Sequence, residues 1–360
     1  MTETIGPDDV ADLCAGAAFL ATGGGGDPYV SQLLCEHQLK KYGPAKLISP
    51  NDLPDDALVV SVGSVGAPTV TLEQLPDDEA GVSIIREFEA LMGRKVDAVI
   101  PFEVGGGNST IPLYVAAAMG IPCVDGDGMG RALPEAQMMT FPIYGVKPTP
   151  ALIMDPFGNS ALLKCDDVET FERHIRALAV AMGGMVLSAE HSMTGKQAKT
   201  SAVPHTISFA KKLGNILLCH GGDVTEIEPQ MKDLFEQSDY GTFKKLYQGK
   251  VVDNQRKVVG GYDVGSALLE SFDDDVPAME LTIKNEYLLA KVGDEVVASV
   301  PDLICVVEQE TSRPLNAERM RYGQRVCVYG VGCTDHYLSE KALKVVSPRA
   351  FGLDYDYKRL

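Results

Sequence analysis

The chain has 360 residues, 45% of them apolar, which is enough for a sizeable core and predicts two domains. Its formal net charge of −18 argues against nucleic acid and against anionic membranes as partners, because both attract clusters of Lys and Arg.

The first residues show neither a signal-peptide pattern nor a membrane span. No basic residue precedes Lys40, and the apolar stretch 14–21 is short and runs into four glycines. A signal peptide needs a basic start, and a span needs about 20 apolar residues. The eight cysteines are scattered without a C-x-x-C pair. We therefore expect reduced thiols in a cytoplasmic protein.

Alternating strand and helix patterns predict an α/β domain over residues 1–165. An apolar helix is expected at about 10–20. The following pattern predicts strands and helices in alternation at 58–62, 82–92, 98–102, 108–119 and 122–124. Asn108 or Ser109 is the expected cap of the second of these helices. The order favours a mainly parallel sheet with right-handed crossovers, which places the ends of strands 98–102 and 122–124 at one edge.

The rest of the chain predicts a helical segment and then a β-rich one. Residues 166–242 are expected to form a helical connecting region that packs on the first domain. Its helices should cover 168–182, capped by Asp166 or Asp167, and 206–215. Short β-type runs then occur at 250–252, 281–283, 295–300, 303–307 and 325–329. They predict a mostly β domain over 243–360, either a sandwich or a barrel-like sheet.

A run of four glycines follows the first expected helix, in the segment Thr22-Gly23-Gly24-Gly25-Gly26-Asp27. It can form a nest of backbone N–H groups for an anionic or carbonyl ligand. The alternative is a flexible helix C-cap and turn. Because ordering four glycines carries a large entropy cost, we favour ligand binding. No Gly-Lys-Ser/Thr follows and no strand precedes, so no nucleotide cofactor is expected.

A second glycine-rich turn follows the strand at 98–102. Glu103 stands at the strand end, before Gly105, Gly106, Gly107 and Asn108, which open a helix. A carboxylate at this point lies beside the positive end of the helix dipole. The alternative is that Glu103 accepts hydrogen bonds from loop amides and holds the turn. We favour a role for Glu103 in a site.

The third turn, Asp125-Gly126-Asp127-Gly128-Met129-Gly130-Arg131, follows the strand at 122–124. It is not a calcium loop, because Met129 and Ala136 stand where oxygen ligands are needed. The two aspartates can share a metal or work as an acid/base pair. The alternative is an Asx-type turn that caps a helix at 133–139. Arg131 and Glu135 are four apart, as in a helix-surface ion pair.

Histidine and cysteine add weaker candidates. His191, His205 and His220 fall in one stretch between the domains, and one of them can join the carboxylates on a metal. Cys123 follows a strand beside Asp125, but no histidine is next to it in sequence. A small buried apolar role is therefore favoured for Cys123 over a nucleophile.

Taken together, the glycine-rich turns resemble the S-methyl thiohydantoin desulfurase-like family. Later landmarks extend the resemblance to essentially the whole chain, at 246–253, 285–286, 300–304 and 348–352. The resemblance implies an α/β domain followed by a mostly β domain. It also implies hydrolytic removal of methanethiol from an S-methylated thiohydantoin, which gives a hydantoin. His205 stands where the family pattern has glycine, so a ligand role for His205 is not carried over.

We therefore expect a hydrolase of a small heterocyclic substrate. Glu103, Asp125 and Asp127 are expected to act as the base or to bind one divalent metal (Zn, Mn or Mg). Arg131 would orient an anionic substrate group, and substrate would also bind Thr22, Gly23, Gly24, Gly25, Gly26, Asp27, Gly105, Gly106, Gly107 and Asn108. The alternatives are a non-catalytic subunit that binds a hydantoin-like ligand, and lyase or cyclase chemistry in the same cleft. The exact substrate and a homo-oligomeric state are left open.

Overall fold

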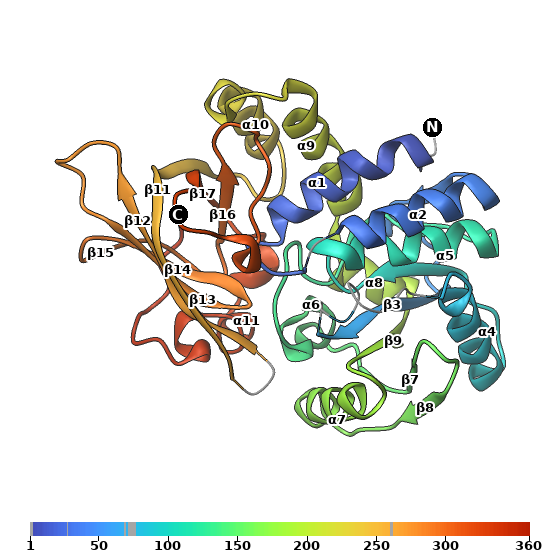
Figure 1. Ribbon diagram of the computed structural model, residues 1–360. Helices are drawn as coiled ribbons and strands as arrows, with labels where there is room; N and C mark the ends of the chain where they lie inside the picture. The colour runs from blue at the N-terminus through green and yellow to red at the C-terminus, as the bar shows by residue number, and fades with distance from the viewer. Residues whose placement is uncertain (1–2, 27, 68–69, 71–76, 260–261) are drawn as a thin grey trace.

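The computed structural model describes residues 3–26, 28–67, 70, 77–259 and 262–360. Its described residues form a large α/β sheet, mainly from the first half of the chain, and a large antiparallel sheet from the second (Figure 1). A third sheet pairs only β6 Gly126–Asp127 with β10 Val203–Pro204. The described part of the chain has no helix that is long and apolar enough to cross a membrane. None of the eight cysteines, all of which the structure describes, forms a disulfide.

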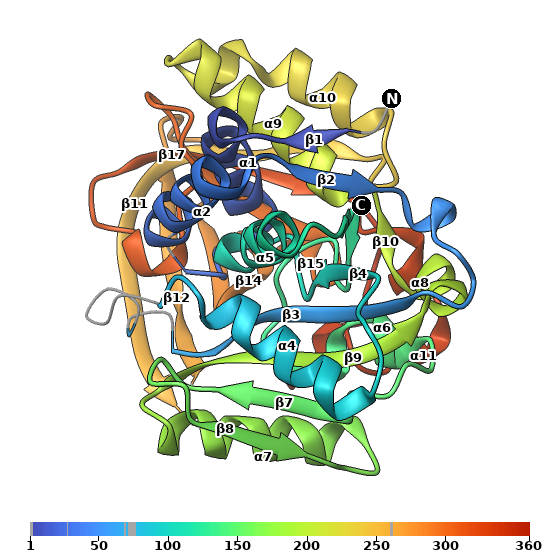
Figure 2. The same cartoon turned by 90° about the vertical axis from the view of Figure 1, so that its right-hand side faces the viewer.

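Eight described strands form the first sheet, in the order β1-β2-β5-β4-β3-β9-β7-β8. Figure 2 shows β1, β2, β4, β3, β9, β7 and β8 from top to bottom. The central neighbours β2, β5, β4 and β3 are parallel, and antiparallel pairing adds β1 on one side and β9, β7 and β8 on the other. The predicted mainly parallel α/β sheet is confirmed. The strands are β1 Thr4–Ile5, β2 Ala45–Ile48, β3 Leu58–Gly66, β4 Ala98–Pro101, β5 Cys123–Val124, β7 Ala151–Met154, β8 Ser160–Leu163 and β9 Met185–Thr194.

Helices cover both faces of this sheet. Successive strand residues point to opposite faces, so Val59 and Ile100 join one core cluster while Val60 and Val99 join another. The second cluster holds residues of α1, α2, α4 and α5, and the first holds residues of α6, α7 and α8. The helices are α1 Val10–Leu20, α2 Tyr29–Tyr42, α4 Ala80–Met92, α5 Ile111–Met119, α6 Thr140–Ile143, α7 Val168–Ala181, α8 Gly195–Ser201, α9 Thr206–His220, α10 Glu228–Glu236 and α11 Glu340–Leu343.

Two predictions about helices are wrong, one about an N-cap and one about a whole helix. A 3-10 turn at Gly106–Ser109 precedes α5, and Thr110 takes the N-cap position that was expected for Asn108 or Ser109. Asn108 turns its side chain to Ser64 instead. The helix expected at 133–139 is only a 3-10 turn at Ala136–Met138. By contrast, Asp167 caps α7 as predicted, accepting from the N–H of Thr170.

The segment 166–242 holds more than the helices that were predicted for it. Strand β9 crosses the sheet between β3 and β7. Its polar residues Ser188, Glu190 and His191 are buried, so the sequence lacks the apolar run of an interior strand. The division of the chain at 165 and 242 stays a prediction.

The second sheet has seven described strands, in the order β15-β14-β13-β12-β11-β17-β16. Every neighbouring pair is antiparallel, and the sheet curls into a half-barrel (Figure 1). This confirms the barrel-like alternative for the mostly β domain. The strands are β11 Phe243–Val259, β12 Tyr262–Ser271, β13 Met279–Lys284, β14 Glu286–Val292, β15 Glu295–Ser299, β16 Leu303–Glu308 and β17 Arg325–Val331.

Helices α1 and α9 pack backbone to backbone through glycine. A Cβ atom at Gly214 would lie 1.6 Å from the carbonyl oxygen of Asp12, and one at Gly16 would lie 1.8 Å from that of Ala210. Neither neighbour is a flexible side chain, so neither can move aside. This contact fixes α9, whose first turn borders the glycine-rich segments.

We expect Gly214→Ala to lower the free energy of unfolding by about 1–3 kcal/mol, because overpacking forces the two backbones apart. Urea denaturation measures the change. Gly6→Ala is the control, since its Cβ would find its nearest neighbour at an ordinary 3.6 Å. Equal stability of the two variants would contradict the close approach.

Candidate functional site

The two acidic, glycine-rich turns meet at one edge of the first sheet. Strands β4 and β5 are parallel neighbours, with Val99 opposite Cys123, so the segments that follow them leave the sheet together. The N–H of Val104 donates to Asp127 Oδ2 at 2.6 Å, and the N–H of Gly128 donates to the carbonyl of Phe102 at 2.9 Å. The prediction that the two strand ends share an edge is confirmed.

Asp127 holds these turns together. It is fully buried and accepts the N–H groups of Val104, Met129 and Gly130. Burial raises the pKa of Asp127 to about 7, and these N–H groups oppose the rise. Its oxygens are therefore engaged by the loop backbone, which is the turn-forming alternative left open by the sequence.

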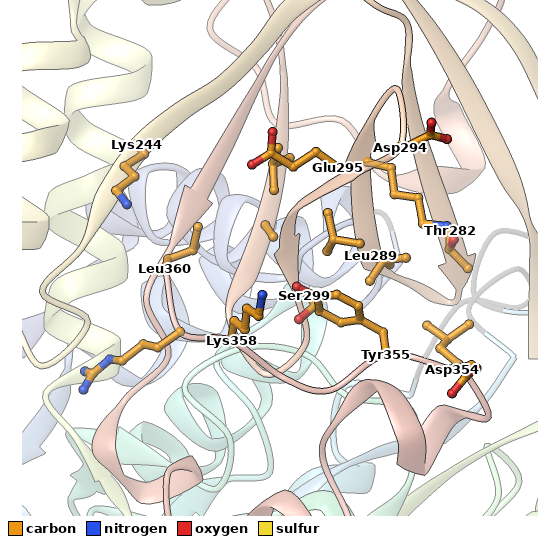
Figure 3. A pocket seen from close by; sticks show the side chains of 16 residues that line it. Lys244, Thr282, Leu289, Asp294, Glu295, Ser299, Asp354, Tyr355, Lys358 and Leu360 are labelled. Carbon is orange, nitrogen blue, oxygen red and sulfur yellow. The ribbon is translucent and has the colours of Figure 1, made fainter.

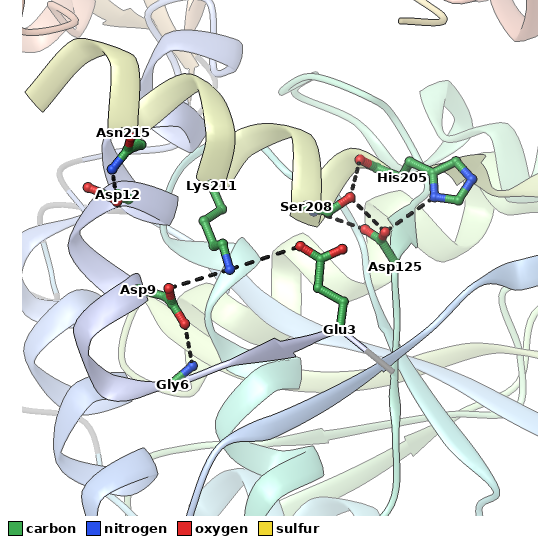
Figure 4. Close-up of polar contacts among 9 residues, drawn as sticks. All are labelled: Glu3, Gly6, Asp9, Asp12, Asp125, His205, Ser208, Lys211 and Asn215. Carbon is green, nitrogen blue, oxygen red and sulfur yellow. Dashed lines mark hydrogen bonds and ion pairs between the residues drawn. The ribbon is translucent and has the colours of Figure 1, made fainter. Parts of the chain in front are cut away.

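Asp125 faces α9 (Figure 4). Its carboxylate accepts from the N–H of Ser208 at 3.0 Å and from the Ser208 hydroxyl at 2.7 Å, and Nδ1 of His205 lies at 3.3 Å. His205 has a φ of 61°, in the left-handed region that favours glycine. A cavity of about 300 Å³ adjoins this group, lined among others by His205, Ser208 and Lys212.

The three carboxylates expected to bind a metal do not gather. Asp125 and Asp127 have the separate partners just described, and no three His, Cys, Asp or Glu side chains of the described residues are placed to hold an ion. His191 is buried against Glu190, with Nδ1 and Oε1 3.1 Å apart. The side chain of His220 lies outside the described part. The metal ion stays a prediction.

The four-glycine run lies where the two domains meet. A Cβ at Gly23 would lie 2.4 Å from the Tyr287 ring, and one at Gly24 would lie 2.1 Å from Glu286 Oε1. One at Gly25 would lie 2.9 Å from the backbone of Gly105 and Gly106. Glycine is thus required at Gly23 and Gly25, while a side chain at Gly24 would displace the Glu286 carboxyl.

Backbone groups of the run bind the second domain. The N–H of Tyr287 donates to the carbonyl of Thr22 at 2.7 Å, and the N–H of Ala317 donates to that of Gly23 at 2.9 Å. The amide of Asn316 donates to the carbonyl of Gly26. These carbonyls face the C-terminal sheet, so the run packs against protein rather than forming only an open nest. Asp27, which is predicted to bind substrate, lies outside the described residues.

Arg131 is fully buried and also joins the domains. Its Nη1 donates to the carbonyls of Pro301 at 2.8 Å and Asp302 at 3.1 Å, and its Nη2 donates to Thr22 Oγ1 at 2.8 Å. The alternative of an ion pair with Glu135 is wrong, because Glu135 pairs with Lys284 at 3.0 Å. The charge of Arg131 acts on a different carboxylate, Glu286.

Glu103 lies beside this interdomain junction and remains partly accessible. Its Oε1 accepts from the amide of Asn108 at 2.9 Å. Burial and the neighbouring Glu286 and Asp127 raise the pKa of Glu103 to about 8, against the amide of Asn108 and the N–H of Leu133. A carboxyl with such a pKa exchanges protons near neutral pH.

Glu286 is a site residue for which no chemical role was predicted from the sequence. It appears in the sequence analysis only within the segment 285–286, which extends the family resemblance. It begins β14, is 3% exposed, and has an Oε2 atom that no donor of the described chain reaches. Burial raises the pKa of Glu286 to about 8, and Arg131, Arg176 and Lys284 oppose the rise. The only local signal is Asn285, whose φ of 58° marks a tight turn.

The rim around Glu103 is polar and partly exposed. Asn108 Oδ1 accepts from the N–H of Ser64 at 2.8 Å and from the Ser64 hydroxyl at 3.0 Å, which fixes the amide against Glu103. Gly25, Ser64, Gly107 and Asn108 all keep some accessible surface. Glu103 and its rim therefore keep contact with solvent on this side.

A cavity of about 730 Å³ lies elsewhere, in the C-terminal domain (Figure 3). It is lined by strands β13 to β15, by Lys244 and by the segment 353–360. Its charges are mixed, with Lys291 and Lys358 near Asp294 and Glu295. It includes none of the residues predicted from the sequence, so the Glu103 region is the candidate site.

Comparisons with known proteins agree with the two-domain architecture. Residues 8–165 match the model described as S-Me-THD-like, N-terminal domain, and residues 165–360 match S-Me-THD-like, C-terminal domain. A crystal structure of a protein from Chromobacterium violaceum superposes with a TM-score of 0.83 over 99% of each chain, at 23% identity. At that identity the likeness shows the fold alone. No curated protein matches this chain.

We expect Arg131→Lys to lower the free energy of unfolding by at least about 2 kcal/mol, because one ammonium group cannot reach both the Thr22 hydroxyl and the two carbonyls across the junction. Chemical denaturation followed by circular dichroism measures the loss. Arg173→Lys, on the exposed face of α7, is the control and should change stability by about 0.5 kcal/mol or less. Unchanged stability of Arg131→Lys would contradict the interdomain role.

Stability should also fall as the pH rises from about 4.5 to about 8, where Glu103 and Glu286 bind protons in the folded chain but not in the unfolded one. Their stabilising contribution is complete below the unfolded pKa of 4.5 and is lost as pH rises through the folded pKa of about 8. Denaturation midpoints across this range measure the trend. Glu286→Gln removes one group, so its decline should be shallower than that of the parent. If stability declines equally with pH in Glu286→Gln and in the parent, the pKa of Glu286 is not raised in the folded chain.

Proposed function

The chain belongs to the S-Me-THD-like family, and we propose that it is a hydrolase that removes methanethiol from an S-methylated thiohydantoin to give a hydantoin. Family membership supports the substrate class. The half-buried, glycine-bordered site at the junction supports a small, planar, heterocyclic substrate. The catalytic part of the proposal rests on the raised pKa and partial accessibility of Glu103.

Glu103 has the properties of an acid/base group. Its pKa of about 8 keeps both protonation states accessible at neutral pH, which is where general acid/base catalysis is most effective. Asn108, itself held by Ser64, donates to one oxygen of Glu103, and the residue remains partly accessible. In the reaction, water attacks the ring carbon that carries the thioether, and Glu103 exchanges a proton with the reactants.

Asp125 and Asp127 have supporting roles in this proposal. Asp127 positions the turn that follows Glu103, through the N–H of Val104. Asp125 anchors the first turn of α9 through Ser208. Arg131 keeps the C-terminal domain against the site.

We expect Glu103→Gln to lose about 10²–10⁴-fold in kcat for methanethiol release while remaining folded, since the amide keeps the shape but cannot carry the proton. A thiol-trapping assay with an S-methylated thiohydantoin measures it. Asp167→Ala is the control: it removes the cap of α7, should cost about 1 kcal/mol of stability, and should leave turnover unchanged.

Near-normal turnover of Glu103→Gln would identify Glu103 as a residue that only holds its loop. If the parent protein hydrolyses neither S-methylated nor plain hydantoins yet binds them in calorimetry, the alternative of a non-catalytic ligand-binding subunit is favoured.

A further inference from the structure

Glu286 and the turn that follows Glu103 pack against the same glycine loop. Gly24 lies directly against Glu286, because a Cβ there would come 2.1 Å from Oε1. The next residue, Gly25, lies against Gly105 and Gly106, in the turn that Glu103 begins. The loop thus joins the segment that carries Glu103 to the strand that carries Glu286. The two carboxyls are close enough for the charge of one to act on the other.

One side-chain oxygen of Glu286 is an unsatisfied hydrogen-bond acceptor within the described chain. Its Oε2 is buried, and no hydrogen-bond donor of the described residues reaches it. A buried carboxylate oxygen without a donor is costly, so such atoms in native sites are usually completed by water or a ligand. The backbone around Glu286 is fixed, since Tyr287 donates its N–H to Thr22 and its hydroxyl to Leu315. The start of β14 is therefore anchored, while Oε2 of Glu286 is left without a donor among the described residues.

The charged groups that act on Glu286 are positive, whereas those that act on Glu103 are negative. Arg131, Arg176 and Lys284 act on Glu286 and favour its ionised form. Glu103 instead has Asp127 and Glu286 as charged neighbours and lies near the Tyr337 phenol. The pKa of both carboxyls is raised to about 8, so the pair gives up its protons in two steps near neutral pH. The cations that act on Glu286 favour the loss of its proton first, which leaves the second proton on Glu103.

We propose that Glu286 is a second catalytic carboxylate: its Oε2 holds the attacking water and takes a proton from it, while Glu103 carries the proton given to the departing sulfur. This inference rests on the proposed function. It reverses the role of base that the sequence assigns to Glu103, and it makes the site a joint product of both domains.

The proton and electron balance closes within the pair. The water oxygen bonds to the ring carbon as Glu286 takes one of its protons, and the C=N electron pair moves to the ring nitrogen. The electron pair on the ring nitrogen then re-forms the C=N bond as the C–S bond breaks, the electron pair of the C–S bond leaves with sulfur, and Glu103 protonates the sulfur to give methanethiol. The remaining hydroxyl proton passes to the ring nitrogen as the C–O bond becomes the carbonyl and the C=N bond becomes a single bond. Glu286 passes its proton to Glu103, which restores the starting pair.

Leaving-group chemistry separates the two roles. An S-methyl substrate expels a basic thiolate that gains from a proton, whereas an S-(4-nitrophenyl) analogue expels a stable thiolate that does not. We expect Glu103→Gln to lose about 10²–10⁴-fold in kcat with the S-methyl substrate but less than about tenfold with the S-(4-nitrophenyl) analogue. Glu286→Gln should lose about 10²–10⁴-fold with both.

Two controls accompany the pair. Glu89→Gln changes a buried glutamate outside the site, bonded to Val96 and Lys95, and should keep parental turnover with both substrates. Glu286→Ala removes the carboxylate and leaves space, so added formate should restore part of its turnover if the missing group is a base. This second variant decides the question if Glu286→Gln fails to fold.

The outcomes separate this inference from the function on which it rests. A parent protein that releases thiol from neither substrate ends the proposed function. An active parent whose Glu286 variants keep near-parental turnover, or show no formate rescue, overturns the role of Glu286. Equal losses for Glu103→Gln with both leaving groups overturn its assignment as the acid.

Discussion

The buried guanidinium of Arg131 connects the two domains at the candidate site. Arg131 donates across the domain junction to the carbonyls of Pro301 and Asp302 and back to Thr22 at the start of the glycine run. A buried cation is tolerated only where its donors are satisfied and opposite charge is near. Carbonyls supply the first condition, and Glu286 supplies the second. The positions of the glycine loop, of β14 and of the two glutamates all follow from this arrangement.

The glycines serve close packing more than open loop geometry. At Gly24 and Gly25 any side chain would collide with Glu286 or with the Glu103 turn, so these positions set how near the two domains come. That closeness is also what perturbs the carboxyls, because it removes water from both. The same contacts thus determine both packing and acidity.

Much of the fold could be predicted from the sequence, because it depends on local periodicity and turn residues. The stripe of α7, its Asp167 cap and the strand at 58–62 are of this kind. Strand β9 could not be predicted, since its buried polar residues hide the apolar pattern. The shared edge of the Glu103 and Asp127 turns could be predicted, because parallel neighbours end together. The partners of Asp127 could not, since side-chain direction in a glycine-rich turn is not encoded by spacing.

Gly24 and Glu286 stand near opposite ends of the chain, and their contact has a consequence for biosynthesis. A ribosome releases the segment with Glu103 well before it has made β14. Until the C-terminal sheet closes on the glycine loop, the nascent chain has one carboxyl of the pair, in water and with an ordinary acidity. Contacts so distant in sequence form late. The raised pKa values of the two glutamates therefore depend on a contact that a chain without the C-terminal sheet cannot make.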